Sequence, residues 1–258
     1  MPDMTPAELA QRALPLVDLT NLDEACTTAD IDALCARAAT AHGPVAAVCI
    51  WPRFVVQAAS LLAGSGVRIA TVVNFPQGGD DTLAVLAETR QAIADGADEI
   101  DLVMPYRAFL DGRRGFAETQ IRKVREACGD RLLKVILETG EIGDPLLIHA
   151  ASLLAISAGA DFIKTSTGKV KVNATLEAAE IMLTVIEEIR REGGPEIGFK
   201  PAGGIRTLAD AGAYIVIADR ILGANWVAAS HFRFGASGLL DALLAALDGR
   251  EPTTAKGY

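Results

Sequence analysis

The segment TLAVLAETRQAIADGADEIDLVM (Thr82–Met104) decides the fold of this chain. Its first part, Thr82–Asp95, is rich in Ala, Leu and Glu and has the spacing of apolar residues that is typical of a helix. Its last six residues, EIDLVM (Glu99–Met104), form a short apolar run that is typical of a buried strand. A helix that leads within a few residues into a strand is the repeating unit of an α/β protein.

The same alternation recurs along the whole sequence. Seven further runs have strand character: Ala46–Ile50, Ile69–Phe75, Leu133–Glu138, Phe162–Ser166, Ile197–Pro201, Arg220–Ala224 and Phe232–Gly235. Helical segments separate them, such as Leu176–Glu192 and one that Thr207 opens, with Asp210 in a weak capping box. Eight strands in 258 residues give about 32 residues per unit, near the length of a βαβ element.

This count predicts an α/β protein with the architecture of a single-domain (β/α)8 TIM barrel. The domain is expected to span residues 1–258, with an N-terminal helical extension and a short flexible C-terminal tail. The alternative is an open doubly wound sheet, which usually carries a glycine-rich turn after an early strand. Here the glycine-rich turns, Thr167-Gly168-Lys169 and Ala202-Gly203-Gly204, follow late strands, which favours the barrel.

Composition places the chain among globular proteins. Apolar residues make up 50% of it and charged residues 22%. The longest stretch without Asp, Glu, Lys or Arg, Pro145–Ala160, has 16 residues, fewer than the ~20 of a spanning helix. The sequence from Met1 lacks the basic and apolar regions of a secretory signal. We therefore expect a cytoplasmic protein without a membrane partner.

Charge and cysteine usage restrict the partners further. The net charge of -9 argues against nucleic acid or an anionic membrane, although a small anion held by a few local donors fits it. The four cysteines and three histidines form no cluster with the spacing of zinc ligands. A carboxylate site for magnesium remains open at this stage. Four scattered cysteines in a cytoplasmic chain are expected to be reduced.

Three charged residues stand out because they fall inside predicted strands. Alternation along EIDLVM, FIKTS and IGFKP places Asp101, Lys164 and Lys200 on the face opposite the helices, so their side chains should point into the barrel. They also lie toward the carboxyl ends of their strands, where barrels hold catalytic groups. The alternative for each is a structural ion pair, or a lysine that extends to the barrel mouth. Two inward lysines beside one aspartate weaken that alternative.

The chemistry of such a cluster is specific. A neighbouring cation disfavours a second ammonium, so the pKa of one of the two lysines should be lowered. A neutral lysine amine attacks carbonyl groups and forms Schiff bases. Lys134 has the same strand parity but lies at the start of its strand, so we interpret it as a structural partner of a carboxylate.

The sequence resembles the deoxyribose-phosphate aldolases, which are class I Schiff-base aldolases on a (β/α)8 barrel. The shared blocks cover nearly the whole chain, and DFIKTSTGK (Asp161–Lys169) and GFKPAGG (Gly198–Gly204) are the most specific. The other blocks are VDLTNL (17–22), AAVCIWPRF (46–54), TVVNFPQGGDD (71–81), ETRQAIADGADEIDLVMPYRA (88–108), LLKVILETG (132–140), RFGASGLL (233–240) and the terminal Tyr258.

The resemblance implies a role for each matched position. Lys164 would form the Schiff base with acetaldehyde, Lys200 would keep that amine reactive, and Asp101 would relay protons with a bound water. Tyr258 would assist proton transfer at the enamine carbon. The implied reaction is the reversible cleavage of 2-deoxy-D-ribose 5-phosphate to D-glyceraldehyde 3-phosphate and acetaldehyde, in deoxyribonucleotide catabolism. It needs no metal and no organic cofactor, and the family suggests a homodimer.

Further positions are expected to bind the substrate. Glycine turns with nearby cationic side chains suit a phosphate, since backbone N–H groups can approach the anion. The candidates there are Gly168, Lys169, Gly203, Gly204, Arg206, Gly235, Ser237 and Gly238. By resemblance, Asp18, Thr20 and Thr165 lie near the sugar. The family often has two serines where this chain has Ser237-Gly238, so its phosphate affinity could differ.

Two other functions compete with the aldolase. A phosphosugar isomerase or epimerase on the same barrel would need a positioned Glu or His base and no pair of inward lysines. A non-catalytic phosphosugar-binding protein would keep the glycine turns but has no use for Lys164 beside Lys200. Cys49, which also matches the family, is interpreted as a small buried residue without a catalytic role.

Overall fold

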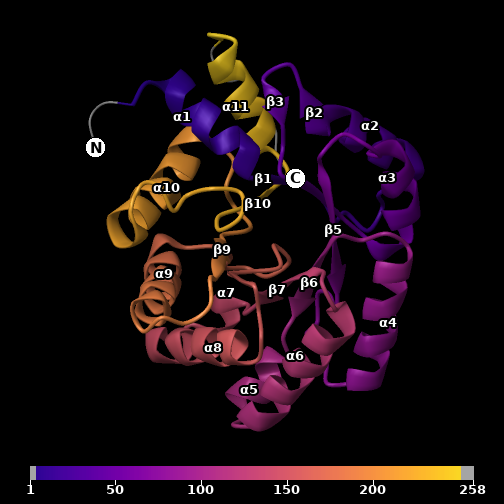
Figure 1. The fold of residues 1–258 in the computed structure, drawn as a ribbon, viewed down its shortest axis with the longest axis vertical. Helices are drawn as coiled ribbons and strands as arrows, with labels where there is room; N and C mark the ends of the chain where they lie inside the picture. The colour runs from indigo at the N-terminus through magenta and orange to yellow at the C-terminus, as the bar shows by residue number, and fades with distance from the viewer. Residues whose placement is uncertain (1–3, 251–258) are drawn as a thin grey trace.

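The computed structural model describes residues 4–250, and their strands form a barrel (Figure 1). Eight parallel strands pair in the order β10-β1-β4-β5-β6-β7-β8-β9. Parallel bridges from Phe199 to Phe232 and from Ala202 to Gly235 then join the two ends of this order. The strands are β1 (Val17–Asn21), β4 (Ala47–Ile50), β5 (Arg68–Val73), β6 (Glu99–Val103), β7 (Leu132–Ile136), β8 (Phe162–Lys164), β9 (Gly198–Lys200) and β10 (Phe234–Ala236). The predicted α/β TIM barrel is confirmed.

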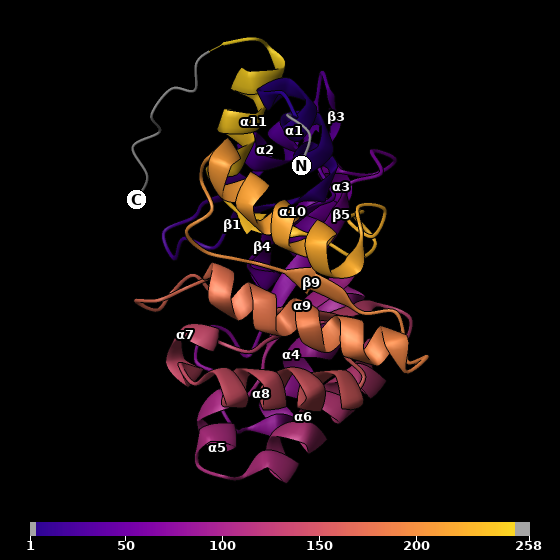
Figure 2. The ribbon, with the colours of Figure 1, turned by 90° about the vertical axis from the view of Figure 1, so that its left-hand side faces the viewer.

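Helices surround the strands on the outside. Figure 2 shows α8, α9 and α10 as neighbouring rods along one side. The α-helices are α1 (Pro6–Ala13), α2 (Thr28–Ala38), α3 (Val55–Leu61), α4 (Thr82–Ala94), α5 (Tyr106–Leu110), α6 (Arg114–Cys128), α7 (Thr139–Ile142), α8 (Pro145–Ser157), α9 (Leu176–Arg191), α10 (Leu208–Leu222) and α11 (Leu239–Leu247). Short 3-10 turns, η1 (Leu14–Leu16) and η2 (Pro52–Phe54), and a small hairpin of β2 (Ala39–Thr40) and β3 (Gly43–Pro44) complete the elements. No helix within residues 4–250 is long and apolar enough to cross a membrane.

One predicted strand is wrong. The run Arg220–Ala224 is not a strand, because Arg220 to Leu222 form the last turn of α10. The buried positions of that helix, Ile215, Ala218 and Leu222, recur three and four residues apart, as one helix face requires. Gly223, with a φ of 91°, then ends the helix. The adjacent apolar residues Ile221 and Leu222, followed by Gly223, hid this continuing helical period. The capping box of Thr207 and Asp210 that opens α10 is confirmed.

The sequence also concealed the first strand. Val17–Asn21 forms β1 and pairs with β10 and β4. Its Asp18 and Thr20 are more typical of turns and helix caps than of strands, so the segment was not among the predicted strands. The total of eight is therefore correct although one member was misplaced. The three glycine turns follow the sixth, seventh and eighth barrel strands, not the fifth, sixth and eighth of the predicted set.

The amino-terminal part of the barrel interior is filled by side chains. Gly198 pairs with Phe162, and a methyl group on Gly198 would lie 2.3 Å from the Phe162 ring, so the glycine makes room for that ring. The Arg233 guanidinium lies 5.9 Å from the centre of the same ring. Above this layer the interior is charged. Because side chains fill the amino-terminal part of the interior, a substrate site is expected at the carboxyl ends of the strands.

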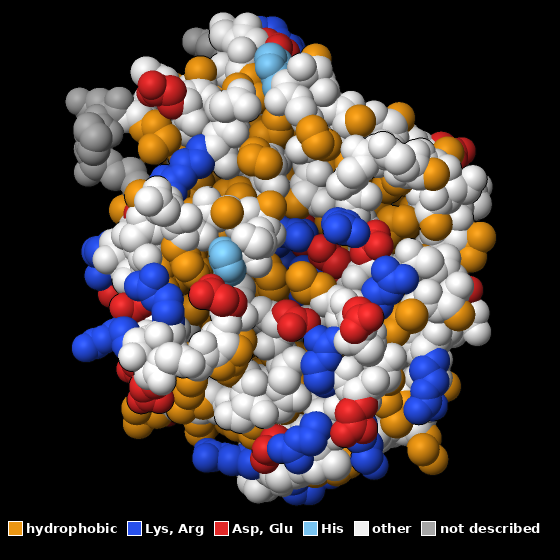
Figure 3. All heavy atoms as spheres, viewed as in Figure 1, with side chains coloured by type: hydrophobic (Ala, Val, Ile, Leu, Met, Phe, Trp, Pro, Cys, Tyr) orange, Lys and Arg blue, Asp and Glu red, His pale blue; other side chains and the backbone are white. Residues whose placement is uncertain are grey.

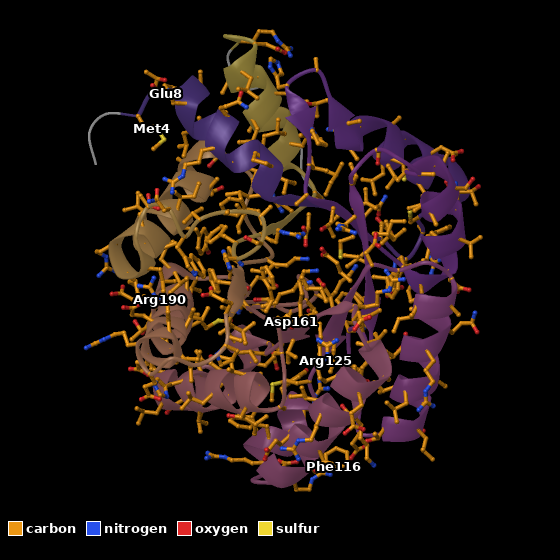
Figure 4. All side chains as sticks on the ribbon, in the orientation of Figure 1. Met4, Glu8, Phe116, Arg125, Asp161 and Arg190 are labelled. Atoms are coloured by element: carbon orange, nitrogen blue, oxygen red, sulfur yellow. The ribbon has the colours of Figure 1, made fainter. Side chains whose placement is uncertain are left out.

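An ion pair ties β8 to the outer helices at the start of that strand. Figure 4 labels Arg125 of α6 and Asp161, which precedes β8. Their side chains form an ion pair, and Asp161 also accepts a hydrogen bond from the backbone N–H of Leu133 at 2.7 Å. These two contacts fix the position of β8 relative to β7 and α6. Lys164 lies three residues further along the same strand.

Candidate active site

Asp101, Lys164 and Lys200 meet inside the barrel, as the strand alternation predicts. Both lysine ammonium groups donate to Oδ2 of Asp101, each at 2.8 Å. The strand register explains the meeting, because Lys164 and Lys200 are paired neighbours on β8 and β9. Lys164 and Lys200 are each the last residue of their strand, so both lie at its carboxyl end. All three side chains are buried, with Lys164 exposed by 3%.

Lys134 is also part of the cluster. It pairs in register with Asp101, and its ammonium donates to Oδ1 of Asp101 at 2.9 Å and to Oε2 of Glu99 at 2.5 Å. The interpretation of Lys134 as a partner of carboxylates is therefore confirmed. Asp101 thus accepts from three ammonium groups with its two oxygens. Burial alone would raise its pKa, but Lys134, Lys164 and Lys200 outweigh burial and hold the pKa of Asp101 well below its usual range.

Lys200 is held as an ammonium. It donates to Asp101 and also, at 2.5 Å, to Oδ2 of Asp18. Burial would lower its pKa, but the two carboxylates outweigh burial and raise the pKa of Lys200 above its usual value. If either lysine acts as a neutral amine, Lys200 is therefore the less suited of the two. The residue pattern left open which lysine would be the neutral one, and the family resemblance implied Lys164.

Asp18 lies within the charged cluster. Its Oδ2 accepts from Lys200 and its Oδ1 accepts from Arg233 at 2.7 Å, and the side chain is fully buried. Burial would raise its pKa, but Lys200 and Arg233 outweigh it, so the pKa of Asp18 is lowered. Thr20, two residues along β1, donates from Oγ1 to the carbonyl of Asp18. The first strand thus supplies one of the carboxylates that neutralise the lysines.

Two charged members of the cluster were not among the predicted site residues. Arg233 donates to both Asp18 and Glu99, with 2.9 Å between Nη2 and Oε1 of Glu99. Burial would lower its pKa, but the two carboxylates raise it. Glu99 shares the inward face of β6 with Asp101, so strand alternation was a signal that could have found it. Arg233 precedes β10 and is the first residue of the shared block RFGASGLL, in which only the glycine turn was interpreted as part of the site.

Glu138 is a further residue that sequence reasoning missed. It follows β7 with a φ of 61°, in the left-handed region that non-glycine residues seldom adopt. Its carboxylate accepts from the Thr167 backbone N–H at 3.1 Å and from Thr167 Oγ1 at 2.6 Å. Burial raises its pKa, and the bonds to Thr167 oppose that rise. The contact fixes the loop that carries Gly168 and Lys169.

The predicted phosphate turns lie beside one another. The backbone N–H of Gly203 donates to the carbonyl of Gly235 at 3.4 Å. A methyl group on Gly203 would lie 2.7 Å from Cβ of Asn173, so the turns after β8 and β9 are in contact. Thr165 Oγ1 accepts from the backbone N–H of Ala202 at 3.0 Å and holds the same two turns together.

The remaining substrate-binding candidates occupy the rims of these turns. Gly168, Lys169, Gly204, Arg206 and Ser237 are exposed, and Gly238 is partly buried at the N-cap of α11. The Lys169 ammonium donates to the carbonyl of Leu22 at 2.7 Å, which links the loop after β8 to the end of β1. Tyr258, the fourth predicted catalytic residue, lies outside the described residues.

Other features of the structure lie away from this cluster. A surface hollow of about 450 Å³, lined by Arg190, Glu196, Trp226 and His231 among others, is formed by loops that precede β9 and β10, at the opposite end of the barrel. Within residues 4–250, no group of three or more His, Cys, Asp or Glu side chains could hold a metal ion. Figure 3 shows basic and acidic side chains interspersed over one face of the molecule.

Fold and site together define a class of protein: an enzyme on a (β/α)8 barrel, with lysines at the carboxyl ends of its strands placed for carbonyl chemistry. Comparison with known proteins makes this assignment more specific. The sequence profile of the DeoC/LacD family aldolases matches residues 12–243. The chain belongs to this family, and it is a lyase.

Individual relatives agree with the family assignment. A curated deoxyribose-phosphate aldolase of Agrobacterium fabrum is 56% identical over 256 residues, which cover 98% of this chain and 97% of that protein. A crystal structure from Coccidioides immitis, provisionally assigned as a deoxyribose-phosphate aldolase, is 32% identical with a TM-score of 0.80, over 94% of this chain and 86% of that one. A tetrameric deoxyribose phosphate aldolase of Aeropyrum pernix, 24% identical over 93% of this chain and 92% of that one, shares the fold with a TM-score of 0.74.

Proposed function

We propose that this protein cleaves 2-deoxy-D-ribose 5-phosphate reversibly to D-glyceraldehyde 3-phosphate and acetaldehyde, through a Schiff base on Lys164. The observation that carries the proposal is the pair of lysines on one carboxylate oxygen of Asp101. Lys200 has two carboxylate partners and stays charged, whereas Lys164 has one, which it shares. Lys164 is therefore the lysine that can give up its proton and attack a carbonyl carbon.

The reaction proceeds in balanced steps. The neutral Lys164 amine adds to the aldehyde carbon of the open-chain sugar, and loss of water leaves a protonated imine. A base takes the proton of the 3-hydroxyl, the C2–C3 bond breaks, and its electron pair moves to the imine nitrogen. D-glyceraldehyde 3-phosphate leaves, and an enamine remains on Lys164. Protonation of the enamine carbon and hydrolysis then release acetaldehyde and restore the lysine.

Proton transfers are assigned to groups beside Lys164. Asp101, with a bound water, is the relay for the hydroxyl proton, and its three cationic partners keep it ionised. Tyr258 is proposed to act at the enamine carbon, in line with the family resemblance. General acid–base steps of this kind each accelerate a reaction by about 10²–10⁴-fold. No metal or organic cofactor is needed, because the protonated imine itself accepts the electrons.

The phosphate group is proposed to bind at the three adjoining glycine turns. The backbone N–H of Gly203 donates to the carbonyl of Gly235, and that of Gly235 donates to Pro201, so these glycines hold the turns in place. The backbone N–H of Gly204 and the N-terminus of α11 are the donors proposed for the anion. Lys169, Arg206 and Ser237 lie on exposed rims of the same turns and can add charge and hydrogen bonds. The sugar is proposed to bind near Asp18, Thr20 and Thr165. At the phosphate, Gly168 and Gly238 let the backbone approach the anion.

The competing isomerase has less support from the described residues. Such an enzyme needs an available Glu or His base at the barrel mouth. The buried Glu99 is paired with Lys134 and Arg233, and Glu138 is bonded to Thr167. The three histidines, His42, His149 and His231, lie on the periphery beside acidic residues. The arrangement therefore favours lysine chemistry.

The cellular setting is part of the same proposal. All four cysteines are free and buried, which supports a reducing compartment such as the cytoplasm. We place the enzyme there as a homodimer acting on small molecules. Light scattering on the purified protein measures the oligomeric state, and a monomer or a tetramer would contradict the dimer.

One experiment tests the chemistry. The protein is incubated with acetaldehyde and borohydride, and the reduced adduct is located by mass spectrometry. We expect an ethyl group on Lys164, no adduct at that site in Lys164→Met, and wild-type labelling in the matched surface variant Lys171→Met. Labelling confined to exposed lysines would refute the assigned mechanism.

A further inference from the structure

Six buried charged side chains form a closed ring of ion pairs next to Lys164. Around the ring, Lys134 joins Asp101 to Glu99, Arg233 joins Glu99 to Asp18, and Lys200 joins Asp18 back to Asp101. The six contacts range from 2.5 to 2.9 Å. None of the six residues is more than 5% exposed, so water screens these charges little.

The ring is balanced in charge without Lys164. It holds three carboxylates and three cations, and each carboxylate lies between two of the cations. Lys164 is a fourth cation, and its ion pair is with Asp101, whose charge Lys134 and Lys200 already compensate. An ammonium at position 164 therefore adds a charge that the ring does not neutralise, whereas a neutral amine adds none.

We propose that Glu99, Lys134 and Arg233 are positioning residues that set, through the net charge of this ring, how much of Lys164 is present as the neutral amine. The inference rests on the proposed Schiff-base function of Lys164. It adds to that function three residues that do not touch the substrate. Of these, Lys134 contacts Asp101, whereas Glu99 and Arg233 do not. Their effect on Lys164 is electrostatic and acts through their neighbours in the ring.

The same balance acts later in the reaction. The protonated imine on Lys164 carries a positive charge, as the ammonium does. When the C2–C3 bond breaks, its electron pair neutralises that charge and gives the enamine. Because the neutral ring does not compensate a further positive charge, burial favours the uncharged states of Lys164, which are the free amine and the enamine. A ring with a missing cation would favour the charged states and slow both the attack and the cleavage.

Among residues 4–250, two other titratable groups face Lys164 from the surrounding strands. Glu138, after β7, interacts with Lys164 electrostatically, but its hydrogen bonds go to Thr167 and not to the ring. Cys49 of β4 lies 3.9 Å from Oδ2 of Asp101, and burial raises the pKa of its thiol, which keeps it neutral. The charged groups that face Lys164 from β1, β6, β7 and β9 are those of the ring, and neither Glu138 nor Cys49 changes in the variants below.

The test is the pH dependence of kcat/KM, which reports essential groups of the free enzyme. The acid limb of this profile is the range in which activity rises with pH. Lys134→Met leaves the ring with a net charge of -1, which favours the ammonium form of Lys164. The acid limb should therefore move to higher pH by about one unit. Glu99→Gln leaves a net charge of +1 and moves the limb to lower pH by about the same amount. Opposite shifts from two ring members are a signature that structural damage would not give.

Further variants keep the test informative if a single variant does not fold. The double variant Glu99→Gln/Lys134→Met restores a neutral ring, and its acid limb should return to within about 0.3 units of wild type, because no net charge has changed. Arg233→Met removes a different cation and should shift the limb in the same direction as Lys134→Met. These two variants carry the test if either single variant does not fold. Lys123→Met and Glu192→Gln change the same charges on the surface and should leave the profile unchanged.

The outcomes separate this inference from the function it rests on. Borohydride trapping with acetaldehyde, at a pH on each variant's plateau, should label Lys164 in all folded variants. Shifts in the same direction, no shift, or a double variant displaced as far as its parents would overturn the charge-balance role while leaving the Schiff base intact. Absence of labelling at Lys164 in the wild type would instead overturn the proposed function.

Discussion

Lys164 and Lys200 donate to the same atom, Oδ2 of Asp101, at equal distances of 2.8 Å. The two lysines are equivalent only in this contact with Asp101. Lys200 has a second carboxylate partner in Asp18 and is fully buried, whereas Lys164 has Asp101 alone and is 3% exposed. Two lysines that are paired in register on adjacent strands therefore differ in the number of carboxylates that contact them.

Replacing Lys200 by methionine should nearly abolish turnover. The change leaves Asp18 and Asp101 short of one cation, so the uncompensated carboxylates favour the ammonium form of Lys164 over the reactive amine. Breaking a buried pair in this way typically costs about 3–5 kcal/mol, so the free energy of unfolding should fall by that order. We expect kcat to drop by about 10² or more, measured in a coupled assay, with Lys123→Met as the control. Wild-type turnover in folded Lys200→Met would contradict the role assigned to Lys200.

A single methyl group at Gly235 should disturb the site. Cβ of an alanine there would lie 2.8 Å from Cβ of Ala202 and 3.2 Å from Cε of Lys200, so the stem of Lys200 or the turn after β9 must move. Overpacking of this kind typically costs about 1–3 kcal/mol, and we expect both the melting temperature and kcat to fall. Gly115→Ala is the matched control, because nothing lies within 4 Å of a methyl group there and the residue is exposed in a helix. Equal effects of the two substitutions would argue against close packing at Gly235.

Serine at Gly238 should strengthen phosphate binding. The residue has a φ of -99°, which any side chain tolerates, and an added Cβ has open space around it. A hydroxyl at this N-cap would add a hydrogen bond worth about 0.5–1.5 kcal/mol, so KM for the phosphorylated sugar should fall about 2- to 10-fold at unchanged kcat. Unphosphorylated deoxyribose is the control substrate. The same change in KM for both sugars would place residue 238 away from the phosphate.

The ring should give the fold a wide plateau of stability against pH. The pKa values of Asp18 and Asp101 are lowered on folding, so their contribution is complete above their unfolded pKa of about 4 and is lost as pH falls through the folded values. The pKa values of Lys134 and Lys200 are raised, so theirs is complete below about pH 10.4 and is lost as pH rises through the folded values. Urea unfolding at a series of pH values should show losses at both extremes. A ring contribution that disappears between pH 5 and 9 would be inconsistent with these shifts.

Much of the fold and the centre of the site followed from local patterns. Alternation alone placed Asp101, Lys164 and Lys200 on inward faces, because side chains along a strand point to opposite sides in turn. Local patterns failed at Arg220–Ala224, where a helix continued through the apolar residues Ile221 and Leu222, and at Val17–Asn21, where polar residues hid a strand. In both segments the tertiary structure overrode local preference, since packing against neighbours decides which backbone form a short run adopts.

By itself the sequence determined the α/β barrel, the family resemblance and the three charged residues at the carboxyl ends of the strands. Only the tertiary structure decided how those charges are shared. Arg233 reaches Glu99 across 134 positions of sequence and Lys200 reaches Asp18 across 182, distances at which no local pattern carries information. Closing the barrel brings the first and last strands together and completes the ring of ion pairs. That closure distinguishes Lys164 from Lys200, because a lysine's charge depends on every carboxylate and cation around it and not on its own neighbours in the chain.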